Sequence, residues 1–334
     1  DTYIITDSVR KITELAVKKT GLKSFPEGTV ILSSRAPIGK VAIAGCEMYC
    51  NQGFKNLICS KKINNKYLYW FLKGNTVFLN SLGRGATFKE LSKSIVSNIE
   101  INLPDIVYQK KAVETLEKVS EIIALRKREL SSLDDLIKAR FVEMFGDPAT
   151  NPMRWSETTI GDECFYIKDG PHKSLPDIGK ENGGHPFISV RNIVNGYIDF
   201  STARYISDED YANAIKKCHP EKGDMLYSKG GTTGIAKLID IDEEFANWVH
   251  VAVLKFDKSK LNGIFFENML NGDYCFEQSQ RLTKGIANRD LVLSAMAQIK
   301  MYRPPMEIQK QFADFVNQVD KSKVAIQKAL DKTQ

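Results

Sequence analysis

Residues 104–146 have the sequence PDIVYQKKAVETLEKVSEIIALRKRELSSLDDLIKARFVEMFG, with no internal Pro or Gly. This stretch predicts one long helix, because Pro104 suits a first helical turn and Gly146-Asp147-Pro148 ends it. Mainly apolar residues recur at alternating spacings of three and four, which is typical of a coiled-coil seam. The seam positions are Ala112, Leu116, Val119, Ile123, Arg126, Leu130, Leu133, Ile137, Arg140 and Met144. We expect a spacer arm roughly 60 Å long at about 1.5 Å per residue.

A second copy of this region lies 200 residues further along, since residues 82–119 align without a gap to 282–319. Nine positions are identical, against roughly two expected by chance at ordinary composition. The identities are Leu82/Leu282, Gly85/Gly285, Leu91/Leu291, Ser94/Ser294, Ile99/Ile299, Pro104/Pro304, Gln109/Gln309, Lys110/Lys310 and Val119/Val319. Upstream, residues 28–45 match 223–240. The chain is therefore an internal duplication.

The duplication predicts an α+β protein with two similar modules, each followed by a long helix. We expect each module to combine twisted, mainly antiparallel strands with short helices. The expected ranges are 1–103 for the first module, 104–146 for its helix, 147–303 for the second module and 304–334 for the second helix. By comparison of the two copies, the first module lacks its start and the second helix is shorter. The second helix carries Phe312, Val316, Val319, Ile326 and Leu330 on one seam.

Periodicity and turn residues predict the elements within each module. In the first module we expect helices at 9–19 and 67–79, a polar loop at 83–89, and strands at 29–33, 41–44, 56–59 and 99–103. In the second module we expect strands near 187–190, 224–227, 236–239 and 249–256.

Composition favours a cytoplasmic protein without a membrane span. The chain has 43% hydrophobic residues, no run of eighteen apolar residues and no basic-then-apolar start. Its six cysteines form no C-x-x-C motif, which favours reduced thiols. The net charge of +6 is unevenly distributed, at +8 over residues 1–103 and −3 over 146–303. DNA binding by the second module would therefore need local basic loops.

Motifs for catalysis are absent from the sequence. The glycine-rich loop at 229–234 lacks the G-x-x-x-x-G-K-[ST] spacing of a phosphate-binding loop. A methyltransferase motif is approached only at 303–306, and the Pro-Asp pairs at 104–105 and 176–177 lack the acidic-x-Lys of a nuclease. The four histidines show no metal or triad spacing. We expect no catalytic residue, no metal and no cofactor.

Polar loops with long cationic side chains recur in both modules. Such donors reach DNA phosphates or guanine edges, and amides suit adenine. A solvated loop is the simpler interpretation for any one residue, but recurrence favours nucleic acid. The candidates are Arg35, Lys40, Asn51, Gln52, Lys55, Arg84 and Lys89, followed by Arg191, Asn192, Lys229, Thr232, Thr233, Lys237, Asn247, His250, Lys284 and Arg289. We expect Arg35 and Lys229 to contact bases. Lys89 and Arg289 are expected to contact phosphates.

A stripe beside the helix seam is a candidate docking surface for a partner protein. Ile122, Leu136 and Phe141 lie next to seam positions, and a two-helix rod pairs only part of its surface with itself. We expect these three side chains to face a partner.

The chain resembles the specificity (S) subunit of Type I restriction-modification enzymes. The resemblance is carried by SSRAPIGKVAIAG at 33–45, GRGATFKELSK at 83–93 and LIKARFVEMFGDPATNPMRW at 136–155, together with the repeated strand, loop and helix. It implies two target-recognition domains, each recognising one half of a bipartite DNA sequence. The two long helices would pair as an antiparallel coiled coil, set the spacing and dock two methyltransferase subunits. Restriction subunits would join through that complex.

Two alternatives remain open from the sequence. One is a non-catalytic coiled-coil adaptor that binds only protein. The other is the specificity region of a single-chain enzyme that carries its own methyltransferase.

Overall fold

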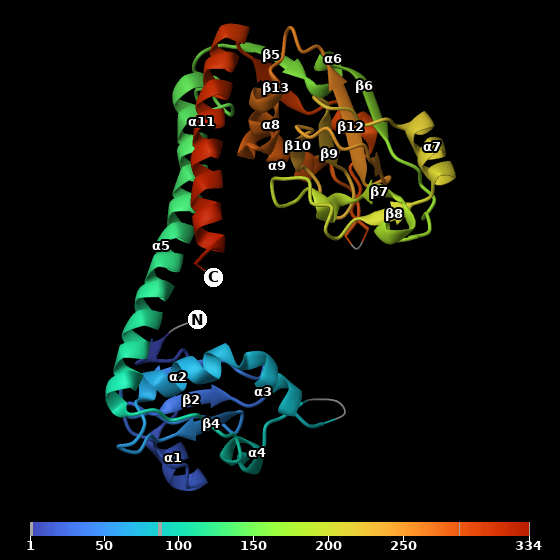
Figure 1. Cartoon of the computed structure of the whole chain (residues 1–334). Coiled ribbons are helices and arrows are strands. Elements are labelled where there is room, and N and C mark those ends of the chain that lie inside the picture. The colour runs from blue at the N-terminus through green and yellow to red at the C-terminus, as the bar shows by residue number, and fades with distance from the viewer. Residues whose placement is uncertain (1–2, 86–88, 287, 334) are drawn as a thin grey trace. The chain divides into compact units, whose positions relative to one another are not determined.

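The computed structural model describes residues 3–85, 89–286 and 288–333. The chain forms two compact units, residues 1–126 with 333–334 (unit 1) and residues 127–332 (unit 2). Helix α5, Ile106–Phe145, begins in unit 1 and ends in unit 2 (Figure 1). Its 40 uninterrupted residues confirm the prediction of one long helix.

Unit 1 is built on a four-stranded sheet in the order β1-β3-β2-β4. The strands are β1 (Ile4–Ile5), β2 (Val30–Ser33), β3 (Val41–Ala44) and β4 (Phe54–Leu57). β2 runs antiparallel to β3 and β4, and β1 is parallel to β3. The helices of the module are α1 (Glu14–Thr20), α2 (Asn65–Gly74), α3 (Thr76–Leu82) and α4 (Lys93–Ser97). Buried leucines of α2 and α3 form one core with Val30 and Leu32 of β2.

Local sequence explains where the expected elements of unit 1 shift. The helix expected at 67–79 is two helices, because the chain leaves helical geometry at Asn75 directly after Gly74, a poor residue for a helix interior. The helix expected at 9–19 is α1, which begins only after Thr13, whose hydroxyl accepts the Ala16 N–H as a helix cap. β4 begins two residues before the expected range.

The strand expected at 99–103 was wrong, although all five residues belong to the described part of the chain. Their counterparts in unit 2 form β13 (Lys300–Arg303), which pairs antiparallel with β5 (Ser156–Thr159). Among the described residues of unit 1, no strand takes the place of β5 beside residues 100–103. A β-strand needs a hydrogen-bonded neighbour, so the same local sequence pattern forms no strand here.

The described part of unit 2 contains a larger sheet system. A four-stranded antiparallel sheet has the order β10-β9-β12-β6, and a three-stranded sheet has the order β11-β7-β8. The strands are β6 (Cys164–Asp169), β7 (His185–Ile188), β8 (Arg204–Ile206), β9 (Met225–Ser228), β10 (Ala236–Leu238), β11 (Ala246–Asn247) and β12 (Val251–Phe256). The helices are α6 (Ile160–Glu163), α7 (Asp208–Lys217), α8 (Gly263–Asn271), α9 (Asp273–Leu282), α10 (Leu293–Met296) and α11 (Met306–Asp331). The strands expected near 187–190, 224–227, 236–239 and 249–256 are confirmed as β7, β9, β10 and β12.

The central strands of the two units are equivalent, which supports the duplication. β2, β3 and β4 make the same antiparallel pairings as β9, β10 and β12. The turn after the first of these strands is also the same. Ser33 Oγ accepts the Lys40 N–H at 2.9 Å, and Ser228 Oγ accepts the Ile235 N–H at 2.8 Å. Gly39 and Gly234 occupy this turn with φ of 94° and 89°, which favour glycine.

A buried glutamine joins each long helix to its module, and we call this arrangement the glutamine clamp. The Asn64 N–H donates to Gln109 Oε1 at 2.8 Å. Gln109 Nε2 donates to the carbonyls of Lys62 at 3.0 Å and Pro104 at 2.8 Å. Both Gln109 and its counterpart Gln309 have no exposed surface. The same buried hydrogen bonds therefore explain why both copies have glutamine at this position.

The clamp of unit 2 uses the same atoms. Gln309 Oε1 accepts from the Asn262 N–H at 2.8 Å, and Gln309 Nε2 donates to the carbonyls of Lys260 at 3.2 Å and Pro304 at 2.7 Å. Asn64 and Asn262 in turn cap α2 and α8 with their side chains. Each long helix is thus fixed to the first turn of a helix that packs on the sheet.

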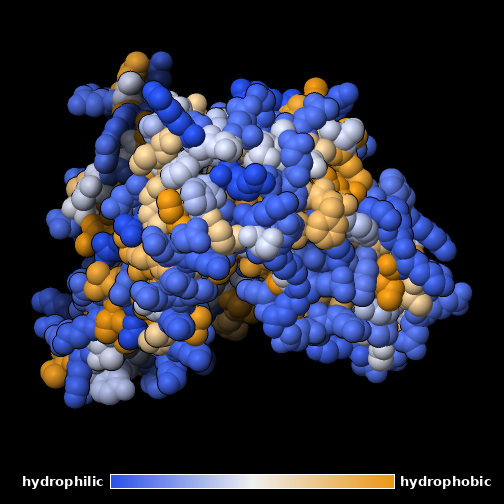
Figure 2. Space-filling model, turned by 90° about the horizontal axis from the view of Figure 1, so that it is seen from above, coloured by the Kyte–Doolittle hydropathy of each residue, from blue (hydrophilic) through white to orange (hydrophobic). Residues whose placement is uncertain are grey.

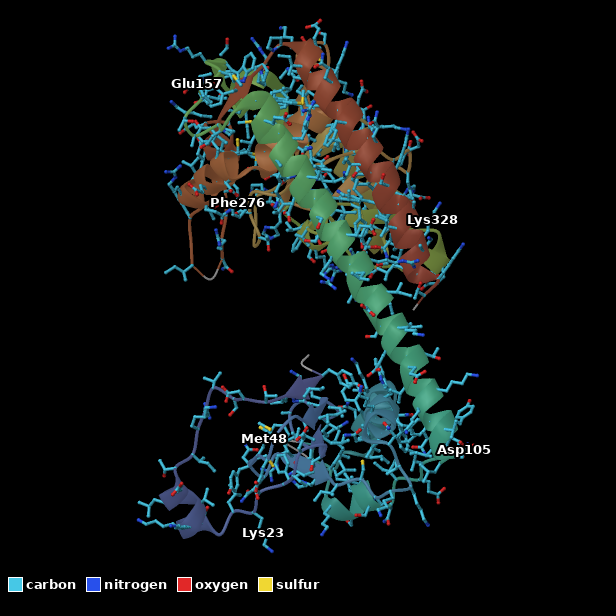
Figure 3. All side chains as sticks on the ribbon, turned by 90° about the vertical axis from the view of Figure 1, so that its left-hand side faces the viewer. Lys23, Met48, Asp105, Glu157, Phe276 and Lys328 are labelled. Atoms are coloured by element: carbon cyan, nitrogen blue, oxygen red, sulfur yellow. The ribbon has the colours of Figure 1, made fainter. Side chains whose placement is uncertain are left out.

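In unit 2 the end of α5 packs antiparallel against α11 (Figures 1 and 3). Lys323 forms an ion pair with Asp134 at 2.6 Å. Phe141, further along α5, contacts Phe312, earlier in α11, with ring centroids 5.4 Å apart. Arg140, a seam position, lies 5.6 Å from the Phe315 ring centroid. The paired helices predicted from the seam are therefore present in this unit.

The structure corrects the expected docking stripe at one residue. Phe141 is only 7% exposed, because its ring stacks on Phe265 and meets the edge of Phe312 in the core of unit 2. Ile122 and Leu136 are 42% and 46% exposed, as a docking residue requires. Phe141 is one helical turn from the seam residue Ile137, and its large ring fills the space next to α8.

The glutamine clamp predicts a specific loss of stability. Gln309→Met keeps the size of the side chain but leaves the Asn262 N–H and two carbonyls without partners. We expect the free energy of unfolding to fall by about 2–4 kcal/mol. Gln311→Met, at an exposed position on the same helix, should change it by less than about 0.5 kcal/mol. Denaturant unfolding of both variants checks this, and equal effects would contradict the clamp.

The corrected stripe gives a second expected outcome. Phe141→Ala should destabilise unit 2 by about 3–5 kcal/mol, because it leaves a cavity among three other phenylalanines. Leu136→Asp, on the exposed face, should cost less than about 1 kcal/mol. Thermal melting of the two variants measures both. A melting temperature that drops as far for Leu136→Asp as for Phe141→Ala would show that Leu136 belongs to the core.

Candidate nucleic-acid interface

The candidate loops gather at one end of the sheet in each unit. In unit 1, β2 ends where β3 and β4 begin, because these neighbours run antiparallel to it. The loop 34–40 and the loop 51–53 therefore meet at this end. In unit 2, β9 and β6 end where β10 and β12 begin, so the loop 229–235, the loop 248–250 and the residues after Asp169 meet in the same way.

A hairpin is attached to this end of each sheet. Arg84 and Glu90 bridge each other, Glu90 also bridges Arg35, and the Leu91 N–H donates to the Ser34 carbonyl at 3.0 Å. In unit 2, Lys284 and Asp290 bridge each other, Asp290 also bridges Gly230, and the Leu291 N–H donates to the Lys229 carbonyl at 2.7 Å. Leu91 and Leu291 are fully buried anchors. Residues 86–88 of the predicted loop 83–89, and residue 287, lie outside the described residues.

In unit 1 the hairpin brings cations around one carboxylate. Arg35 Nη2 lies 2.9 Å from Glu90 Oε2, and Lys55 Nζ lies 3.6 Å from Glu90 Oε1. Lys55 Nζ also donates to Ser34 Oγ at 3.0 Å. The hydrogen bond from Arg35, with the charge of Lys55, lowers the pKa of the Glu90 carboxyl. Glu90 therefore stays ionised at neutral pH.

The other candidates of unit 1 lie on the same loops and hairpin and are exposed. Asn51 Oδ1 accepts the Gly53 N–H at 2.9 Å, which shapes the turn before β4. An open hollow of about 470 Å³ beside the hairpin is lined by Arg84, Glu90 and residues of the α4 region. The exposed candidate residues of unit 1 are Arg35, Lys40, Asn51, Gln52, Arg84 and Lys89.

The basic residues of the two loops are not equivalent. Because the Ser34 and Lys229 carbonyls accept the same hairpin bond, Arg35 corresponds to Gly230 rather than to Lys229. Lys229 is 5% exposed and bonds Asp290 at 2.9 Å, with Asp169 at 3.5 Å. A Cβ at Gly230 would lie 1.8 Å from His250 Nδ1, so glycine is required there. The expected base contact by Lys229 is not available in this conformation.

Several other candidates in unit 2 have structural roles. The amide of Asn192 bonds Ser189, Asp199 and Thr202. Thr233 bonds Thr283, Lys237 pairs with Glu267, and Asn247 donates to the Val251 carbonyl. All four are buried. Their polar groups face the interior, so the interface proposed below leaves them out.

The remaining candidates of unit 2 keep accessible surface. Thr232 and Lys284 are exposed, and His250 is half-buried with its ring against Trp248. Arg191 is exposed and donates to the Thr202 carbonyl at 2.7 Å. Arg289 is half-buried and donates to Gln280 Oε1 at 2.5 Å. These five residues are the accessible part of the set predicted for unit 2.

Sequence reasoning missed the residues that follow β6. Asp169 lies at the same end of the sheet and pairs with Lys217 at 2.9 Å and Lys229 at 3.5 Å. A Cβ at Gly170 would lie 1.7 Å from the Asn247 carbonyl oxygen, so this position also requires glycine. His172 and Lys173 follow and are exposed. The Asp-Gly-Pro turn after an alternating strand was a signal that could have identified them.

The described residues include no cluster of three or more His, Cys, Asp or Glu positioned for a metal ion. Burial raises the pKa of Cys218 to about 11 and of Cys164 and Cys275 to about 12. These thiols stay protonated at neutral pH and are poor nucleophiles. No described helix has the length and apolar character to cross a membrane.

Figure 2 shows hydrophilic residues over most of the face seen from above, with small hydrophobic areas among them. Exposed hydrophobic side chains on α5 include Ile122, Leu125 and Leu136.

Comparison with known proteins identifies a family. A family model described as "Type I restriction modification DNA specificity domain" matches residues 2–134 and 152–333. The chain is 30% identical over 275 residues to the Type I restriction enzyme MjaIX specificity subunit of Methanocaldococcus jannaschii, covering 77% of this chain and 63% of that protein. It is 23% identical over 296 residues to the MjaVIII specificity subunit of the same organism, covering 82% and 69%. The chain thus spans less than two thirds of the MjaIX subunit.

Solved structures share the fold. The crystal structure of a Type I restriction-modification S subunit from M. genitalium aligns with a TM-score of 0.58 at 16% identity, covering 99% of this chain and 85% of that one. A structure described as the basis of complex assembly and conformational transition of the Type I restriction-modification system aligns with a TM-score of 0.58 at 18% identity, covering 93% and 78%. With the family match on both units, this chain belongs to the Type I restriction-modification DNA specificity family.

Proposed function

We propose that each unit recognises one half of a bipartite DNA target. The observation that carries the proposal is the repeated placement of a loop and a hairpin at the same sheet end in both units. This end presents Arg35, Lys40 and Lys89 in unit 1 and His172, Lys173 and Lys284 in unit 2 as accessible groups. Cationic and imidazole side chains on loops suit phosphates and base edges.

The same proposal assigns the long helices to assembly. α5 and α11 would set the distance between the two half-sites and dock two methyltransferase subunits, with restriction subunits joining through the complex. The paired seam in unit 2 and the exposed side chains of Ile122 and Leu136 support this role. The chain alone would neither methylate nor cleave DNA.

A salt titration tests DNA recognition in unit 1. Lys89→Ala should weaken binding to all duplexes alike and reduce the salt slope by about one, because a lysine at a phosphate releases one counterion. Arg35→Ala should instead relax one base position by about 1–3 kcal/mol. Fluorescence anisotropy with duplexes mutated at each position measures both.

The result also separates the alternatives. DNA binding that is absent or insensitive to salt would favour a protein-only adaptor and contradict the proposal. The opposite assignment of the two variants would show that Lys89, not Arg35, contacts a base.

The spacing role predicts the effect of a helix insertion. Seven residues added to α5 and seven at the matching position of α11 preserve the heptad phase and lengthen the rod by about 10 Å. This length is about three base pairs at roughly 3.4 Å each. Sequencing of methylated sites should recover both half-sequences with a longer gap. An unchanged gap would show that the helices do not set the distance.

A further inference from the structure

The two hairpins carry equivalent carboxylates, but these hold different cations. Glu90 and Asp290 occupy the same place, each bridging the hairpin base and the loop after the first central strand. Glu90 holds Arg35, whose side chain is 51% exposed. Asp290 holds Lys229, whose side chain is 6% exposed and lies 3.5 Å from a second carboxylate, Asp169. Glu90 also pairs with Lys55 at 3.6 Å, but that lysine is only 20% exposed and is bonded to Ser34 Oγ as well. Among these cations, Arg35 is therefore the one whose side chain could swing out to solvent by breaking a single ion pair.

An exposed arginine at a DNA-facing loop binds any phosphate. Phosphate contacts raise the affinity for all sequences equally and so lower the ratio of target to non-target binding. A carboxylate that pairs with the arginine reduces this non-specific phosphate binding in two ways. It occupies the guanidinium, and its negative charge repels a phosphate that approaches. A guanine edge, with two acceptors in fixed positions, offers the arginine a bidentate replacement.

The main chain at Glu90 is held in place by bonds that do not involve Arg35. The Glu90 N–H donates to the Arg84 carbonyl at 2.9 Å, and the Arg84 N–H donates to the Glu90 carbonyl at 3.1 Å. The next residue, Leu91, is fully buried. The main chain that carries the carboxylate is thus anchored, and Lys55 remains beside the carboxylate if Arg35 leaves.

We propose that Glu90 is a specificity-determining residue that holds Arg35 away from the phosphates of non-target DNA and releases it to a matching base edge. This inference rests on the proposed function of unit 1 as a DNA-recognition module. In this proposal the acidic residue Glu90 lowers the affinity for non-target DNA.

The test uses the full 334-residue chain and a 30-base-pair duplex pool of random sequence. Glu90→Gln should bind this pool about three- to tenfold more tightly than the unaltered chain, with a salt slope steeper by about one, since the freed Arg35 gains a phosphate. Its affinity for a duplex selected by the unaltered chain should rise less. The ratio of selected to random binding should therefore fall.

Three control variants isolate the cause. Asp290→Asn removes one charge at the equivalent place, but Lys229 keeps Asp169, so binding should stay within about twofold. Glu27→Gln removes one charge before the start of β2, at the opposite end of the strand, and should also stay within about twofold. In an Arg35→Ala background, Glu90→Gln should give no further gain. Thermal melting should show that each variant remains folded.

The outcomes distinguish the inference from the proposed function. If the unaltered chain binds DNA and Glu90→Gln binds the random pool equally or more weakly, the restraint by Glu90 is overturned while the DNA-binding role stands. If the gain persists without Arg35, simple charge repulsion explains it and the restraint is again overturned. If the unaltered chain binds neither duplex at low salt, both the proposed function and this inference fail.

Discussion

The rest of the fold depends on a buried amide at the start of each long helix. Gln109 and Gln309 each accept one main-chain N–H and donate to two carbonyls, with no exposed surface. An apolar side chain would leave all three groups unsatisfied, and a carboxylate would lack the two donors. The N–H belongs to the asparagine that caps α2 or α8, and these helices pack on the sheets. One side chain therefore orients helix and module together in each unit.

A second constraint is made of main-chain bonds and therefore tolerates sequence change. The hairpin after α3 or α9 is attached to the end of the central sheet by bridges and by the Leu91 or Leu291 N–H. None of these bonds involves a side-chain polar group, so residues facing outward can differ without loss of the scaffold. Arg35 in one unit and Gly230 in the other occupy the same position. Main-chain geometry holds the loops, so their outward side chains can vary without loss of the scaffold.

The sequence predicted the duplication, the long helix and the central strands, because periodicity and repeated residues report local structure directly. It could not identify which repeated cations face solvent. Lys229 and Lys237 look like loop lysines in the sequence, but their carboxylate partners Asp290 and Glu267 are 61 and 30 residues away. Residues 99–103 have a strand pattern, and only the presence or absence of a neighbouring strand decides the outcome. Both failures concern long-range partners, which no local pattern encodes.

The two units thus share a scaffold but differ in net charge. Residues 1–103 carry a net charge of +8 and expose Arg35, Lys40 and Lys89. Under the proposed function, attraction to phosphates would therefore be strong, and sequence discrimination would need a restraint such as Glu90. Residues 146–303 carry −3, and the lysine at the loop is neutralised by Asp169 and Asp290. Under the proposed function, DNA binding there would rely on short-range contacts by groups such as His172 and Lys284, since a net negative charge repels DNA. Under the proposed function, discrimination in this unit would follow from weak general attraction, and its loop lysine, Lys229, is already held by two carboxylates.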